Sequence, residues 1–189
     1  MASNHRTVIS TQCYSSSQNT GNKDIFSDEI LSQILTIKDS SQHSTLIGFT
    51  CSTFDLLHPG HIIMLKDSKD QCDVLVVGIQ HDPTIDRPDD KNKPIQTLKE
   101  RKIMLESCKY IDHIIEYSTE NDLYNILDNL QPDIRILGSD WKDKQYTGYE
   151  LPNIKIHWHD RTVHNYSTTN LRKRICYIEN SYNVKKPIQ

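Results

Sequence analysis

Long apolar runs, alanine and glycine are scarce in this chain of 189 residues. Ala2 is the only alanine, glycine occurs six times, and apolar residues make up 35% of the sequence, with a mean hydropathy of −0.63. No run of about 18 apolar residues is present to span a bilayer, and the N-terminus lacks the apolar stretch of a secretory signal. We therefore expect a cytoplasmic protein that does not associate with membranes.

Cysteine pairs and an excess of one charge are missing as well. The five cysteines are widely spaced and form no C-x-x-C motif, which argues against a disulfide framework and against a zinc knuckle. Lys and Arg number 22 and Asp and Glu 25, for a net charge of −3. This balance argues against general nucleic-acid binding, although a small anionic ligand needs only a few local cations.

Polar residues are concentrated at the two ends of the chain. Residues 1–44 are dominated by Ser, Gln, Asn and Thr, which predicts a largely disordered arm. After Ser27, a plausible N-cap, the helical spacing of apolar residues predicts a short helix that docks on the domain or on a second subunit. Its apolar face comprises Ile30, Leu31, Ile34 and Leu35. Residues 45–179 are expected to form one domain, and residues 180–189 a frayed polar tail.

Short β-rich runs alternate with helical stretches from Thr45 onward. This order predicts an α/β domain with a doubly wound, five-stranded parallel sheet. We expect strands at residues 46–51, 74–79, 113–117, 134–137 and 154–158, and helices at residues 61–69, 98–109, 121–130 and 167–178. The ligand crevice of such a sheet lies beyond the carboxyl ends of the strands, so the loops that follow them are the candidate site.

The loop after the first strand contains the most specific motif. It reads Ser52-Thr53-Phe54-Asp55-Leu56-Leu57-His58-Pro59-Gly60-His61. Pro59 suits a first helical turn, and Gly60 would let a ligand approach the backbone closely. His58 and His61, three residues apart at a helix start, can both point at one anionic group, most simply a phosphate. The alternatives are that the histidines are structural caps or bind zinc with His81, and that Asp55 only caps a turn.

Two later loops offer similar chemistry. In Gly138-Ser139-Asp140-Trp141, the glycine would permit close approach, the aspartate offers an acceptor, and the indole supplies a flat wall or simple packing. The segment after the fifth strand begins with Arg161-Thr162 and ends in Ser167-Thr168-Thr169. Ser167 is a good N-cap, and the hydroxyls with the first N–H groups of the helix would form a second anion site or an ordinary cap.

Together these motifs resemble the H-x-G-H nucleotidyltransferases, and the small glycerol-3-phosphate cytidylyltransferases in particular, over about Leu46–Ile178. The loop pattern of that family is G-x-F-D-x-x-H-x-G-H, and this chain departs from it only at Ser52. The resemblance implies a Rossmann-like fold and a homodimer. It also implies transfer of CMP from CTP to a small phosphate monoester, such as glycerol 3-phosphate, a sugar phosphate or a phospho-alcohol, by direct in-line attack with release of pyrophosphate.

The resemblance also implies roles for individual residues. The catalytic set comprises His58, His61, a lysine of the long polar loop, either Lys91 or Lys93, and Arg161. The nucleotide would contact Thr53, Phe54, Asp55, Gly60, Gly138, Asp140, Trp141, Thr162, Ser167, Thr168 and Thr169. The acceptor substrate would contact Asp82 and Arg101. The alternative for Arg101 is a surface ion pair. Mg²⁺ would be held at Asp55 and Asp140.

Two other functions remain open. One is adenylyl transfer from ATP, as in FAD synthetase-like or heptose-phosphate-like enzymes. The other is a non-catalytic nucleotide-binding homologue, suggested by Ser52 and by the altered spacing between Arg161 and Ser167.

Overall fold

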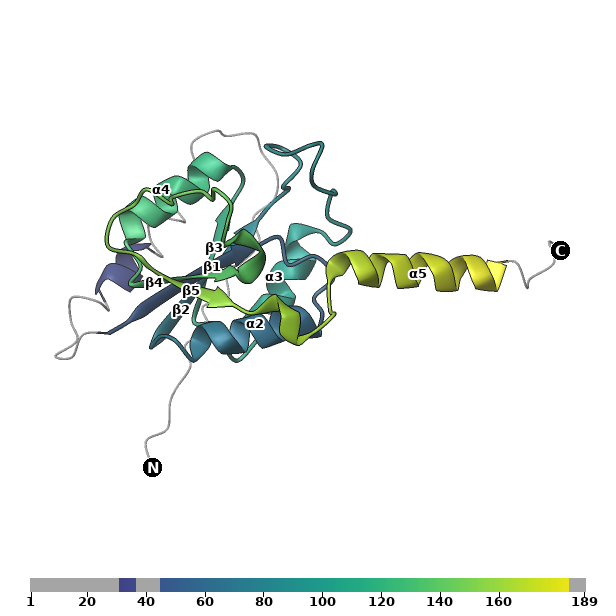
Figure 1. The fold of residues 1–189 in the computed structure, drawn as a ribbon, viewed down its shortest axis with the longest axis horizontal. Coiled ribbons are helices and arrows are strands. Elements are labelled where there is room, and N and C mark those ends of the chain that lie inside the picture. Colours follow the sequence, from purple (N-terminus) through teal and green to yellow (C-terminus); the bar gives the residue numbers. More distant parts are fainter. Residues whose placement is uncertain (1–30, 37–44, 184–189) are drawn as a thin grey trace, which may run out of the picture.

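The computed structural model describes residues 31–36 and 45–183 and shows one parallel sheet covered by helices on both faces (Figure 1). The strands lie in the order β3-β2-β1-β4-β5, which places β1 at the centre. All pairings are parallel, so the expected doubly wound fold is confirmed. The strands are β1 (Ile47–Ser52), β2 (Val74–Gln80), β3 (His113–Tyr117), β4 (Ile134–Gly138) and β5 (Lys155–His159).

Capping residues define where two of the helices begin. Thr97 and Glu100 form a capping box at the start of α3, and Thr119 and Asp122 form another at the start of α4. The helix at the central strand begins at Pro59, at the first-turn position that suits proline. The helices are α2 (Pro59–Lys69), α3 (Leu98–Glu106), α4 (Glu120–Leu130) and α5 (Thr168–Asn183), with short 3₁₀ turns η1 (Ser139–Trp141) and η2 (Arg161–Val163).

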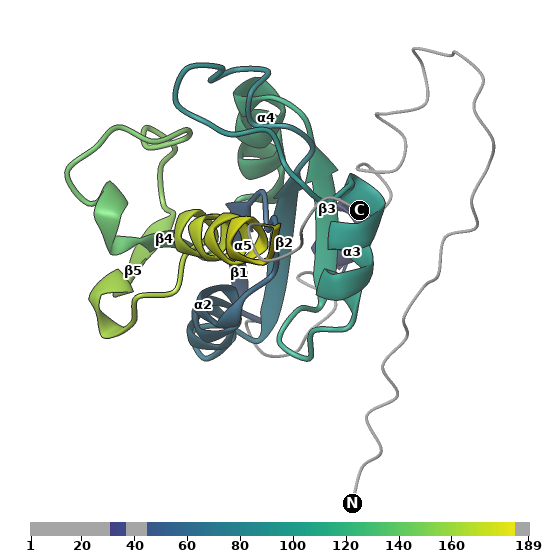
Figure 2. The same cartoon turned by 90° about the vertical axis from the view of Figure 1, so that its right-hand side faces the viewer.

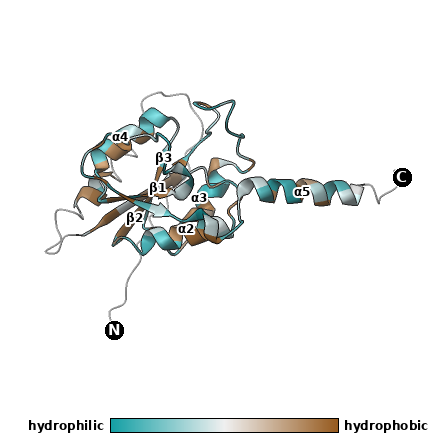
Figure 3. Cartoon of the chain, in the orientation of Figure 1, coloured by the Kyte–Doolittle hydropathy of each residue, from teal (hydrophilic) through white to brown (hydrophobic). Residues whose placement is uncertain are grey.

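Two apolar cores flank the sheet, because successive side chains of a strand point to opposite faces. Along β2, Val76 packs on one side with α4, while Val77 and Ile79 pack on the other with α2 and α3. The hydropathy colouring shows the same division, with brown strands inside and teal outer helix surfaces (Figure 3). No helix in residues 31–36 and 45–183 is long and apolar enough to cross a membrane.

The short helix at residues 31–36 packs on the domain. The sequence predicted docking either on the domain or on a second subunit. Leu31 and Ile34 are buried in the core on the α4 side of the sheet, and Ile34 is 0% exposed, whereas Leu35 is 37% exposed. Ile30 and the rest of the predicted arm lie outside the described residues.

Helix α5 differs from expectation at its end. It continues to Asn183, so the predicted tail begins inside a helix, where Ser181 Oγ donates to the carbonyl of Tyr177. After its first turns the helix projects away from the sheet (Figures 1 and 2). The part of α5 that matters for the cleft is therefore its N-terminal end.

Replacing Ile34 by Ala is expected to destabilise the protein by about 2–5 kcal/mol, because a fully buried aliphatic side chain leaves a cavity. Leu35→Ala, one residue away and partly exposed, is the matched control and should cost less than about 1 kcal/mol. Urea unfolding measures both. Equal losses would show that the helix does not dock through Ile34.

Candidate active site

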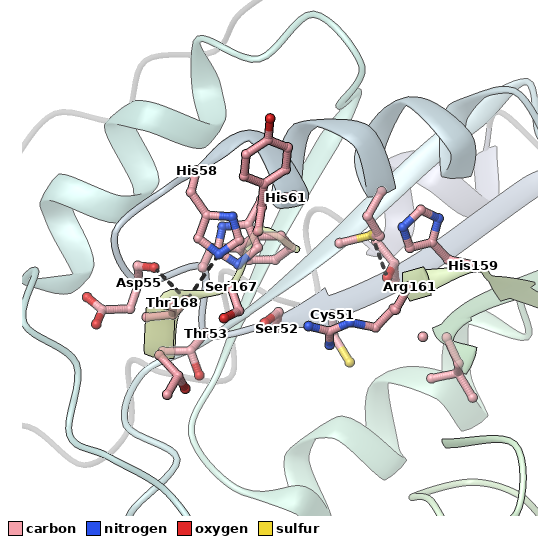
Figure 4. A pocket seen from close by; sticks show the side chains of 18 of the residues that line it. Cys51, Ser52, Thr53, Asp55, His58, His61, His159, Arg161, Ser167 and Thr168 are labelled. Carbon is pink, nitrogen blue, oxygen red and sulfur yellow. Dashed lines mark hydrogen bonds between the residues drawn. The ribbon is translucent and has the colours of Figure 1, made fainter. Parts of the chain in front are cut away.

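Helix α5 begins beside the start of α2, so the two predicted anion sites meet. Thr168 Oγ1 lies 3.3 Å from His58 Nε2 and also 3.3 Å from the carbonyl oxygen of Asp55. The cleft between them has a volume of about 370 Å³ and lies at the carboxyl ends of β1, β4 and β5 (Figure 4). The two clusters therefore line one cleft.

The two histidines of the motif stack on each other. Their ring centroids are 3.9 Å apart, with 17° between the ring planes. Burial lowers the pKa of His61 to about 3, with further lowering from His58 and Arg161, and burial also lowers the pKa of His58. Both rings are therefore neutral at neutral pH. Within the described residues, Nδ1 of each ring is buried without a hydrogen-bond partner, so both rings have bonding capacity left for a ligand.

The loop between β1 and α2 is held in an unusual conformation. Phe54 and Leu56 have φ values of 53° and 50°, in the left-handed region that side chains rarely adopt. Phe54 is anchored in the core on the α2 side, and the Leu56 N–H donates to Gln96 Oε1 at 2.7 Å. Cross-links of this kind offset the backbone strain and fix the position from which His58 and His61 project.

Asp55 acts as the clamp of this loop. Its Oδ1 accepts hydrogen bonds from the backbone N–H groups of Ile95 and Gln96, and its Oδ2 accepts one from Arg172 Nη2 at 2.7 Å. Burial opposes ionisation of Asp55, but Arg172 and the two N–H groups outweigh it and lower the pKa. The carboxylate is thus ionised, 5% exposed and already paired.

The paired carboxylate of Asp55 does not fit a direct ligand of Mg²⁺. A guanidinium and two backbone N–H groups occupy the oxygens that a cation would need. Asp140, the other predicted ligand, is exposed and lies 3.6 Å from Arg161 Nη1. In the described residues, no group of three or more His, Cys, Asp or Glu side chains could hold a metal ion.

Gly60 and Gly138 both line the cleft, and other side chains of the protein also lie close to them. A Cβ at Gly60 would lie 3.0 Å from His164 Cε1 and from Tyr166 Cβ. A Cβ at Gly138 would clash with Asp140 Oδ1 and with Arg161 Cδ. Close approach is indeed required at both positions, but the group that approaches is a neighbouring side chain of the loops after β4 and β5.

The remaining predicted residues divide into two groups. Those that line the cleft are Thr53, Phe54, Lys91, Trp141, Arg161, Ser167 and Thr169. The loop that contains Lys91 is fastened by an ion pair between Arg87 and Glu120 at 2.8 Å. Those outside the lining are Asp82, Lys93, Asp140 and Thr162. The Asp82 carboxylate accepts a hydrogen bond from Thr84, and the Thr162 hydroxyl donates one to Asp160. The backbone carbonyl of Lys93 accepts one from Arg172.

Arg101 was expected to contact the acceptor substrate or, alternatively, to form a surface ion pair. The structure contradicts both expectations. The side chain of Arg101 is 2% exposed, and its guanidinium donates to four backbone carbonyls. These belong to Thr53, Gln80, His81 and Gln96. Arg101 therefore ties together the ends of β1 and β2 beneath the cleft.

Sequence reasoning missed several residues of the site. Arg172 lies one helical turn after Thr168, and that spacing could have indicated that both face the loop after β1. His159, His164 and Tyr166 also line the cleft. For His159 the available signal was the alternation of His157 and His159 on one face of a strand.

Arg101→Met is expected to destabilise the protein by about 3 kcal/mol or more, because one buried and three part-buried carbonyls lose their donors. The neighbouring Lys102, which forms a partly exposed ion pair with Glu116, is the control. Lys102→Met should cost about 0–1 kcal/mol. Urea unfolding of both variants checks the difference, and a small loss for Arg101→Met would contradict the assigned role.

Comparisons with known proteins agree with this geometry. A family model described as "Cytidylyltransferase-like" matches residues 49–174. The "Bifunctional protein HldE" of Helicobacter hepaticus is 31% identical over 159 residues, which are 80% of this chain and 31% of that protein. The HldE protein of Rhodospirillum rubrum is 35% identical over 110 residues, 58% of this chain and 22% of that protein. The chain thus spans about a third or less of the length of these relatives.

Among solved structures, the chain is similar to the lipopolysaccharide core biosynthesis protein from Thermoplasma volcanium. The identity is 30% and the TM-score 0.49, with 61% of this chain and 95% of that chain covered. It is also similar to a pantoate-beta-alanine ligase from Francisella tularensis, at 23% identity and a TM-score of 0.49, with 69% and 64% covered. Because the family model covers more than half of the chain, the protein belongs to the cytidylyltransferase-like family of nucleotidyltransferases.

Proposed function

We propose that the protein transfers a nucleotidyl group from a nucleoside triphosphate to a small phosphorylated acceptor and releases pyrophosphate. One observation supports this above all: Thr168, at the start of α5, lies 3.3 Å from His58, at the start of α2. Two helix N-termini then face one cleft, and each contributes unpaired N–H groups and a positive dipole end. A triphosphate is the ligand that suits two adjoining anion sites.

The histidines would act on the phosphoryl oxygens. A neutral imidazole donates through one nitrogen, and a nearby phosphate opposes the pKa lowering that burial causes in the free protein. Donors fixed before the reaction stabilise negative charge as it builds in the transition state. Arg161 and Lys91, which also line the cleft, add positive charge at the same place.

The reaction would be a direct displacement. An oxygen of the acceptor phosphate attacks the α-phosphorus, a new P–O bond forms, and the bond to pyrophosphate breaks with its electron pair leaving on pyrophosphate. Cys51 lines the cleft, but burial raises the pKa of its thiol, so it is not an activated nucleophile. Positioning and charge stabilisation are then the main contributions of the protein.

Two donors are supported by different observations. The sequence segments Gly138–Trp141 and Arg161–Thr169 favour CTP, in agreement with the description of the family model. The likeness to the HldE proteins supports ATP, with a sugar phosphate as acceptor. The predicted homodimer is not tested by a single chain and stays a prediction.

The function is tested by incubating the protein with each nucleoside triphosphate and a set of phosphorylated sugars, alcohols and glycerol 3-phosphate. We expect pyrophosphate release with one donor, either CTP or ATP, and a product whose mass is the acceptor plus one nucleotidyl group. Tight nucleotide binding without product from any acceptor would favour the non-catalytic alternative.

His61→Ala is expected to lower turnover by about 10²–10³-fold, because it removes one fixed donor to the reacting phosphate. His113→Ala is the control, since His113 begins β3 outside the cleft lining. Steady-state rates measure the effect, and circular dichroism confirms that both variants are folded. Normal turnover by folded His61→Ala protein would refute the role.

A further inference from the structure

Asp67, on α2, binds two histidines of the edge strand β5. Its Oδ2 lies 3.1 Å from His157 Nε2 and 2.7 Å from His159 Nδ1. Burial raises the pKa of Asp67, but the hydrogen bonds from the two histidines outweigh burial and lower it, so the carboxylate is ionised. Because an ionised carboxylate only accepts, each of these ring nitrogens must carry a hydrogen.

This arrangement fixes the chemistry of the opposite nitrogen of His159. The hydrogen on Nδ1 leaves Nε2 as the ring nitrogen open to a ligand, and in the tautomer with a single hydrogen its lone pair is an acceptor. His159 is 4% exposed and lines the cleft (Figure 4). Its Nε2 is buried and, within residues 31–36 and 45–183, has no hydrogen-bond partner. A buried acceptor at the wall of a cleft is a group that a ligand can satisfy.

His157 provides the contrast. It bonds to the same carboxylate oxygen from the same strand, but it is not part of the cleft lining. Its side chain is also more exposed than that of His159. The two residues therefore share the contact with Asp67 and differ in access to the ligand.

The position of His159 separates it from the phosphate site. Strand β4 lies between β1 and the edge strand β5, and His159 pairs in register with Gly138. Two strand spacings place the end of β5 about 10 Å from the end of β1. A nucleotide with its phosphates at the starts of α2 and α5 would extend that far with its nucleoside. An acceptor nitrogen repels phosphate oxygens and suits a hydroxyl or amino donor.

We propose that His159, oriented by Asp67, binds the nucleoside part of the substrate, with Nε2 accepting a hydrogen bond from a ribose hydroxyl or a base amino group. This inference rests on the proposed function, because it requires a nucleotide in the cleft.

The first test compares His159→Leu with the matched control His157→Leu. Calorimetry measures the dissociation constants of CTP and ATP, and kinetics measure KM and kcat for the active donor. One lost hydrogen bond predicts a dissociation constant and KM raised about three- to tenfold in His159→Leu, with kcat nearly unchanged. His157→Leu should bind as the wild type does. Thermal melting establishes that both variants are folded.

Modified nucleotides identify the donor group. The probes are the 2′-deoxy and 3′-deoxy triphosphates and the analogue without the base amino group, which is UTP for CTP and purine riboside triphosphate for ATP. The wild type should bind one of these three analogues more weakly than the unmodified nucleotide. His159→Leu should bind that analogue and the unmodified nucleotide with equal affinity. Asp67→Leu should reproduce this insensitivity, whereas Asp67→Asn, which keeps an acceptor oxygen, should restore the wild-type pattern.

The outcomes separate the two proposals. If wild-type protein transfers nucleotides and His159→Leu binds them as tightly, the inference is wrong and the proposed function stands. The inference is also wrong if every analogue loses the same affinity in wild type and in His159→Leu. If the wild type binds no nucleoside triphosphate, the proposed function and the inference both fail.

Discussion

The contact between the start of α5 and the loop after β1 is the interaction on which the site depends. Arg172 pairs with Asp55 at 2.7 Å and also donates to the carbonyl of Lys93. Asp55 in turn holds the backbone of Ile95 and Gln96. One carboxylate thus joins the central loop, the long loop after β2 and the last helix. Without this clamp, Thr168 would not be held beside His58, because the rest of α5 projects away from the sheet.

The electrostatics of the cleft follow from the same arrangement. Arg172, which lines the cleft, is already paired with Asp55, and burial keeps both motif histidines uncharged in the free protein. Attraction for an anion then comes from helix N-termini, Arg161 and Lys91. These groups are the ones that the proposed anion site would use in a protein with a net charge of −3. The likeness to the cytidylyltransferase-like family extends over residues 49–174, which include both helix starts.

Local patterns predicted the fold because local physics determines its elements. All five strands lie within one residue of their expected bounds, since β-rich runs between turn residues have few alternatives. The meeting of the loops at the starts of α2 and α5 was also predictable, because a parallel sheet brings the loops after its strands together. Helix ends were less certain, and α5 runs five residues beyond the expected end at Ile178 because nothing in its sequence stops it.

Contacts between distant residues account for what sequence reasoning missed. Arg172 and Asp55 are 117 residues apart, and no local pattern reveals their pairing. Gly60 and Gly138 indicated that some group approaches the backbone closely, but no local pattern indicated that His164, Tyr166 and Arg161 lie against them. Arg101 follows the capping box at the start of α3, where the sequence pattern is also compatible with a surface residue. The fold instead places Arg101 under the loops after β1 and β2.

The central claim is that both helix starts bind one triphosphate. Nuclear magnetic resonance can follow the ring nitrogens of His58 and His61 together with the backbone amides of Thr168 and Thr169 while the donor nucleotide is added. The account predicts that all four sets of signals shift with one common dissociation constant and that the pKa values of both histidines rise. The account would be contradicted if only the signals from one helix start shifted. It would also be contradicted if the two sets of signals saturated at different nucleotide concentrations.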